Sequence, residues 1–209
     1  MNEIKYYIDL IKKEIKIAFK DNSYLLLFST LLFLIPMFLG YFFPQYLDSL
    51  MNPVVDTFRN RVETGEIKLV TDSIFLNNFN VAIVLYFGAI FIGLLTAMIL
   101  IINGMFIGYF ASSMNLGTFL LLTLPHGIIE LPAIIIAACG GFVLLNFIIN
   151  FIIDIFKNQN NRIAISFNDN LDKLVSSLVF LGIAIVLLAI ASFIEVYFTI
   201  GFANFVMGL

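Results

Sequence analysis

The sequence predicts an all-α protein, a polytopic bundle of about five transmembrane helices with amphipathic helices at the membrane surface. Two observations carry this prediction. Hydrophobic residues make up 61% of the 209 residues and charged residues only 12%, against about 45 to 50% and about 25% in soluble domains. The mean hydropathy is +1.04, and the few charges cluster, which leaves long stretches without Asp, Glu, Lys or Arg.

The uncharged stretches set the transmembrane spans. Residues 24–43 are 20 uncharged positions, and 20 residues in a helix extend about 30 Å, the thickness of the hydrocarbon core of a bilayer. Residues 73–129 are also free of charge, but they are too long for one crossing. We expect this stretch to fold back at Asn103-Gly104, at residues 115–117 and at residues 125–127. The predicted spans are 24–43, 79–102, 104–124, 128–153 and 174–195.

The third predicted span has two possible structures. It is either a full crossing or two half-helices, broken at residues 115–117, which membrane proteins tolerate where the backbone is buried in protein. The basic residues favour the full crossing. Five lysines precede the first span, which places the N-terminus in the cytoplasm by the positive-inside rule. Five crossings then return the basic loop 156–173 to the cytoplasm and leave the C-terminus outside.

The sequence divides into a cytoplasmic amphipathic helix, residues 1–23, and a single transmembrane domain, residues 24–209, with an extracytoplasmic amphipathic loop at about 44–75. In the first segment, apolar residues recur at helical spacing opposite five lysines, which is typical of a helix on an anionic membrane surface. The alternative is a simple extension of the first span. The lysines are Lys5, Lys12, Lys13, Lys16 and Lys20, and the lipid bilayer is their expected partner.

The extracytoplasmic loop also has apolar residues at helical spacing. We expect a helix that begins at Asn52-Pro53 and ends at Gly65, since proline suits a first turn and glycine a helix end. This helix would be interfacial, or it would form a lid over the bundle.

Composition excludes several classes of function. The chain has 11 Lys and Arg against 14 Asp and Glu, so it lacks the basic residues that a nucleic-acid-binding face needs. Its single cysteine, Cys139, has no partner for an intramolecular disulfide. With the single histidine His126 we expect no metal site within one chain, and we expect no cofactor and no catalytic residue.

Polar residues within membrane spans are costly and are often functional. His126 and Glu130 are four residues apart and would share one face of a helix. They could activate water, as an intramembrane hydrolase would require. We favour a structural pair that holds a turn at residues 125–127.

Small residues at helical spacing predict close contact between helices, within the chain or between two copies. These residues are Gly104, Gly108, Ala133, Ala137 and Gly141.

The segment from Pro125 through His126, Gly127 and Glu130 to Leu131 resembles a signature of the stage II sporulation protein M family (DUF95 superfamily) of integral membrane proteins. Asn77-Asn78 and the segment 191–199 add to the resemblance, which covers about residues 20–200. The positions that match the signature are Asn103, Gly104, Pro125, His126, Gly127, Glu130, Glu195 and Thr199.

The resemblance implies a non-enzymatic membrane scaffold or membrane-remodelling protein. The sporulation members hold peptidoglycan-degrading enzymes while one membrane migrates around another compartment. We therefore expect a self-associating protein, a homodimer, that contacts the bilayer and other membrane or envelope proteins. A transporter or channel component is the alternative, because in-membrane carboxylates and broken helices build ion and substrate sites. An intramembrane hydrolase is third.

Overall fold

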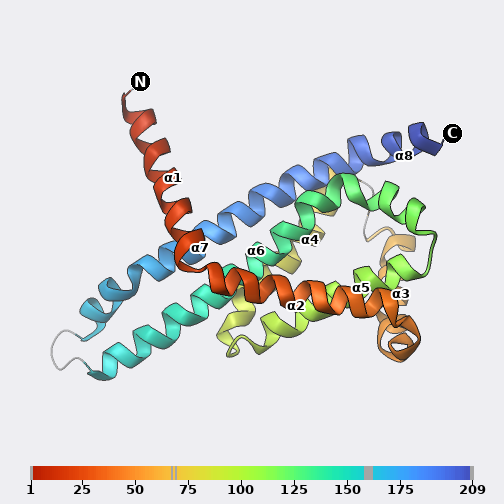
Figure 1. Ribbon diagram of the computed structural model, residues 1–209. Helices are drawn as coiled ribbons and strands as arrows, with labels where there is room; N and C mark the ends of the chain where they lie inside the picture. The colour runs from red at the N-terminus through yellow and green to blue at the C-terminus, as the bar shows by residue number, and fades with distance from the viewer. Residues whose placement is uncertain (1, 67, 69, 158–161, 208–209) are drawn as a thin grey trace.

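The protein is almost entirely helical (Figure 1). The computed structural model describes residues 2–66, 68, 70–157 and 162–207. Five of the described helices are long and apolar enough to cross a membrane, which confirms the predicted fold class. The elements are α1 (Asn2–Asp21), α2 (Ser23–Phe42), the 3-10 turn η1 (Pro44–Tyr46), α3 (Asp48–Glu63), α4 (Thr71–Phe87), the 3-10 turn η2 (Gly88–Ile90), α5 (Leu94–Ser112), α6 (Leu116–Lys157), α7 (Arg162–Ile194), the π-helical turn η3 (Glu195–Thr199) and α8 (Ile200–Met207).

The second and third long helices are α4 and α5, and they differ from the predicted spans 79–102 and 104–124. The predicted break at Asn103-Gly104 is wrong, because both residues lie inside α5. The Asn103 side-chain amide donates to the carbonyl of Ile99, one turn earlier, at 2.8 Å, and so it stays within the helix. The chain reverses earlier, at a loop where Gly93 has a φ of 71°, a conformation that glycine adopts without steric cost.

The fourth long helix, α6, is longer than the predicted span 128–153. The predicted break at residues 125–127 is wrong, since Pro125 and Pro132 both lie inside α6. A proline inside a helix bends it, and the first turns of α6 run at an angle to the rest (Figure 1). The bend therefore replaces the predicted turn.

The predicted break at residues 115–117 lies between α5 and α6. Oδ1 of Asn115 accepts hydrogen bonds from the backbone amides of Gly117, at 2.9 Å, and Thr118, at 3.2 Å. Such a side chain caps the start of a helix. The break thus separates two complete helices and does not divide one span into two half-helices.

The outer spans agree better with the prediction. The first, α2, is within one residue of the predicted 24–43. The last, α7, ends one residue before the predicted 195 but begins at Arg162 instead of 174. The hairpin of α6 and α7 consequently projects beyond the start of α2 (Figure 1).

Small residues bring the helices of the bundle close together. A Cβ atom added to Gly104 or Gly108 would collide with backbone atoms of α2, and one added to Gly141 would lie 2.7 Å from a backbone oxygen of α4. Ala133 and Ala137 of α6 are fully buried. All five small residues therefore pack against neighbouring helices of the same chain.

One buried cluster of hydroxyl groups joins three helices. The Ser177 hydroxyl of α7 lies 2.7 Å from the Tyr86 hydroxyl of α4 and 3.0 Å from the Gly140 carbonyl oxygen of α6. Tyr86 is only 2% exposed. The buried phenol thus depends on Ser177 for a hydrogen-bond partner.

The N-terminal helix α1 leaves the bundle at a steep angle (Figure 1). Only its C-terminal end packs against the other helices: Ala18 is fully buried, and the ring of Phe19 lies 5.0 Å from that of Phe180 on α7. Residues 4–13 are exposed. The helix is therefore attached at one end and uncovered along most of its length.

Helix α3 lies beside the end of α5. It begins at Asp48, earlier than the predicted Asn52-Pro53, and the following Gly65 has a φ of 75°, as a helix-ending glycine does. The Tyr109 hydroxyl of α5 lies 2.7 Å from Oδ1 of Asp48 and 2.8 Å from Oδ1 of Asn52. These contacts hold α3 against the bundle.

Candidate functional site

A cavity of about 320 Å³ with several polar side chains in its wall, here called the polar cavity, lies between the helices of the bundle. Its wall comes mainly from α4, α5 and α6, with single residues from α2 and η3 and two residues from α3. Six of its side chains carry amide, imidazole or carboxylate groups, although they lie among highly apolar helices. They are Asn77, Asn78, Asn103, His126, Glu130 and Glu195.

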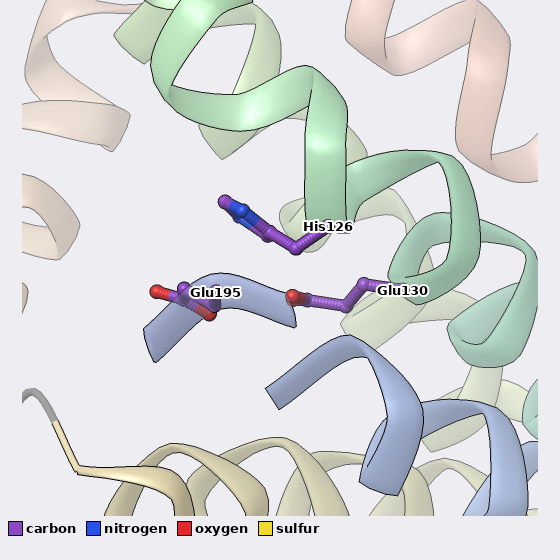
Figure 2. Close-up of side chains that lie close together, drawn as sticks. All are labelled: His126, Glu130 and Glu195. Atoms are coloured by element: carbon purple, nitrogen blue, oxygen red, sulfur yellow. The ribbon is translucent and has the colours of Figure 1, made fainter. Parts of the chain in front are cut away.

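Three of these side chains converge in the cavity. His126, Glu130 and Glu195 each offer one nitrogen or oxygen atom, and these three atoms all lie within 4.8 Å of one another. Figure 2 shows His126 and Glu130 extending from the same helix toward Glu195 on the segment that follows α7. The spacing of four residues puts the first two on one face of α6, and the packing of α7 against α6 adds the third.

The π-helical turn η3 places Glu195 and Thr199 at this cluster. Such turns are rare in proteins as a whole, and those that do occur frequently lie at functional sites. The hydroxyl of Thr199 lies 3.2 Å from Nδ1 of His126, and it donates to the Ile194 carbonyl at 3.3 Å. Thr199 is 2% exposed. The turn therefore both supplies a carboxylate and orients the histidine.

The predicted structural pair of His126 and Glu130 is not formed. The helix continues through residues 125–127, so there is no turn for the pair to hold. The imidazole contacts Thr199, and within the described part of the chain no salt bridge joins it to Glu130. Among those same residues neither Glu130 nor Glu195 has a hydrogen-bond partner or an ion-pair partner.

Helix α3 covers part of the cavity, as a lid would. Its Phe58 lines the wall and lies with its ring 5.5 Å from that of Phe106 on α5. Its Arg61 also lines the wall, but Nε of this residue donates to Glu66 at 2.8 Å. The cationic side chain at the cavity is thus already paired.

The residues that carry the family resemblance gather at this site. Asn103, His126, Gly127, Glu130 and Glu195 line the cavity, and Thr199 contacts His126. The other two take structural positions: Gly104 lies against α2, and Pro125 lies inside α6.

Several residues of the cavity wall could not be predicted from the sequence. Phe119 and Thr123 contribute from the first turns of α6, and Phe58 and Arg61 contribute from α3. Phe119 and Thr123 belong to a segment whose periodicity resembles that of any lipid-facing helix. No local pattern distinguishes them.

The lysines of α1 form a second candidate site, on the surface. All five are exposed, and so are the apolar side chains in the N-terminal half of the same helix, with Ile4 67%, Ile8 45% and Ile11 58% accessible. Apolar side chains and lysines thus lie uncovered along one helix. This is the pattern of a helix that binds a membrane surface.

Comparison with known proteins identifies relatives of this chain. The model of the family described as stage II sporulation protein M matches residues 29–200. Two uncharacterized proteins of Methanocaldococcus jannaschii are similar to this chain. MJ0706 is 28% identical over 193 residues, which cover 88% of this chain and 87% of the relative. MJ0793 is 35% identical over 140 residues, 65% of this chain and 74% of the relative. No solved structure matches.

Proposed function

Since the chain belongs to the stage II sporulation protein M family, we propose that it is a non-enzymatic membrane scaffold that remodels the bilayer through α1. The observation that carries this proposal is the placement of α1. The helix projects steeply from the bundle (Figure 1). It packs only through its last turns, and it exposes its lysines and the apolar side chains of its N-terminal half. A helix in this position can lie in the surface of the membrane that the bundle spans.

The energetics of α1 favour binding to an anionic leaflet. A basic residue near such a surface contributes about 1 kcal/mol, so five lysines contribute about 5 kcal/mol. Ile8 and Ile11 would insert into the boundary between headgroups and acyl chains. A helix that occupies area in one leaflet only acts as a wedge, and this asymmetry bends the membrane.

We propose that the N-terminus lies in the cytoplasm and the C-terminus outside. Five crossings put α1 and the α6–α7 hairpin on one side, together with eight of the 11 basic residues of the chain. This distribution agrees with the positive-inside rule. In this orientation α3 and the polar cavity occupy the extracytoplasmic half of the bundle.

Self-association is part of the proposal. Two copies fixed at an angle would add their wedges, and other membrane or envelope proteins could bind the same assembly. Mass photometry in lipid nanodiscs should detect a dimer. A protein that remains monomeric at all concentrations would exclude this part of the proposal.

Reconstitution tests the remodelling function. Vesicles with anionic lipid that contain the protein should become tubulated or constricted in electron micrographs, and Ile8→Ser with Ile11→Ser should reduce this effect. The matched control is Ile163→Ser with Ile165→Ser at the start of α7, where the two isoleucines are 69% and 42% exposed. If both double variants deform vesicles as well as the unchanged protein, α1 is not the source of curvature.

The polar cavity favours a second candidate function, a transporter or channel component. Transporters place polar binding groups inside the bundle, near the middle of the membrane. A flux of cations or small polar solutes into proteoliposomes, lost in Glu130→Gln, would support this function. Vesicle deformation without any flux would leave the scaffold as the better account.

A further inference from the structure

We propose that His126, Glu130 and Glu195 bind one divalent transition-metal ion. Their three ligand atoms lie within 4.8 Å of one another, and they come from two segments that meet only in the folded chain (Figure 2). The inference rests on the geometry of the cavity and does not depend on membrane remodelling or on transport. It also replaces the expectation, drawn from the single histidine, that one chain offers too few ligands.

The charges at the site call for a cation. Glu130 and Glu195 approach each other inside an apolar bundle, and within the described residues neither has a hydrogen-bond or ion-pair partner. Ionised carboxylates in such surroundings are costly unless they are paired or bind a metal. Arg61, the cation on the cavity wall, is paired with Glu66. A divalent ion would neutralise both carboxylates at once.

The hydrogen bonds of Thr199 prepare the histidine to act as a ligand. The threonine hydroxyl has one proton, which it donates to the Ile194 carbonyl. With its proton so used, the hydroxyl can accept from Nδ1–H of His126, 3.2 Å away, in the tautomer that carries the proton on that nitrogen. In this tautomer the lone pair on Nε2 is available to a metal ion. Metal-binding histidines commonly have such a hydrogen bond on the nitrogen that does not bind the metal.

The donor set indicates the class of metal. One imidazole nitrogen with carboxylate oxygens suits zinc and neighbouring first-row ions, whereas calcium and magnesium favour oxygen ligands in larger number. Bonds of about 2.0 to 2.2 Å require ligand atoms closer together than 4.8 Å, and rotation of the two glutamate side chains can close that gap. Three protein ligands leave one coordination position facing a cavity of about 320 Å³, which water or another ligand can fill.

Metal binding can be measured on the purified full chain without an affinity tag. The protein is stripped with a chelator, loaded with Zn²⁺ in detergent, passed over a gel-filtration column and measured by mass spectrometry of the metal. We expect one ion per chain. We also expect Co²⁺ to give the visible absorption of a low-coordinate nitrogen and oxygen site, a signature that requires no variant.

Variants distinguish Zn²⁺ binding at this site from nonspecific binding elsewhere on the protein. Glu130→Gln and Glu195→Gln should each weaken Zn²⁺ affinity at least about 10-fold, and Thr199→Val should weaken it about 10- to 100-fold through the histidine. Glu63→Gln, an exposed carboxylate at the end of α3, is the matched control and should bind as the unchanged protein does.

Two results would overturn the inference. One is an unchanged protein that retains no stoichiometric ion and gives no Co²⁺ spectrum. The other is equal Zn²⁺ affinity in the two glutamine variants and in Glu63→Gln. In either case no metal ion holds the two carboxyl groups together, and Glu130→Gln should then melt at or above the temperature of the unchanged protein.

Discussion

Replacing Gly108 with alanine should destabilise the bundle. The added methyl group would collide with the backbone carbonyl of Met37 on α2. A backbone atom cannot rotate away as a flexible side chain can, so α5 would have to move away from α2. Overpacking of this kind costs about 1 to 3 kcal/mol. For a chain of this size that corresponds to a fall in melting temperature of about 2 to 12 °C, at about 2 to 4 °C per kcal/mol.

Gly182 provides the matched control for this prediction. It lies inside α7, and a Cβ atom there would have no neighbour within 4 Å. Alanine is preferred to glycine inside a helix by about 0.5 to 1 kcal/mol. Gly182→Ala should therefore melt slightly above the unchanged protein. The same substitution is expected to have opposite signs at the two sites, about 1.5 to 4 kcal/mol apart.

The single cysteine supplies the assay. Cys139 is fully buried in α6, so a thiol-reactive fluorophore should label it only when the bundle opens. Heating the detergent-solubilised protein with this reagent gives a melting temperature, and circular dichroism gives an independent one. Equal melting of the two alanine variants would refute the packing argument. A change of oligomeric state in Gly108→Ala without a change in melting would instead place Gly108 at an interface between copies.

Three further predictions concern the membrane topology, the buried hydroxyl groups and the attachment of helix α3. In a cysteine-free background, a membrane-impermeant reagent applied from outside should label Thr57→Cys on α3 but not Lys157→Cys at the end of α6; labelling of both would exclude the five-crossing orientation. Ser177→Ala should cost about 1 to 3 kcal/mol, because the Tyr86 hydroxyl loses its partner, and adding Tyr86→Phe should recover part of that loss in chemical denaturation; simple additivity would show that the two hydroxyls do not interact. Tyr109→Phe removes the contacts that hold α3, so limited proteolysis between α3 and α4 should accelerate, and an unchanged rate would mean that α3 is held by other contacts.

Local breaking signals misled the sequence prediction at two places. Asn103-Gly104 resembles a loop, but Asn103 bonds within its own helix and Gly104 makes room for α2. Residues 125–127 also resemble a turn, yet they lie inside α6, and a proline inside a helix can bend it without ending it. In this bundle, glycine and proline serve helix contacts and lie inside helices as well as at helix ends, and a local pattern does not distinguish these uses.

Only part of the candidate site could be predicted from the sequence. The spacing of His126 and Glu130 placed them on one helical face, and that prediction depends on helix geometry alone. Their role could not be inferred, because the third side chain, Glu195, and the partner of the imidazole, Thr199, come from the end of another helix. The pairing of the histidine with Glu130 was expected from their proximity in the sequence. In the structure the imidazole contacts Thr199, which lies 73 residues later in the chain.

The sequence by itself determined that the chain is a helical membrane protein, because uncharged stretches of sufficient length leave the backbone no other way to satisfy its hydrogen bonds in lipid. It also determined the amphipathic character of α1, a property of spacing within one helix. The tertiary structure alone decided where the helices turn, which of them the glycines bring together, and that two distant carboxylates share one cavity with a histidine. These features depend on contacts between helices, and transmembrane helices of similar composition can pack in many arrangements until small residues and side-chain hydrogen bonds select one.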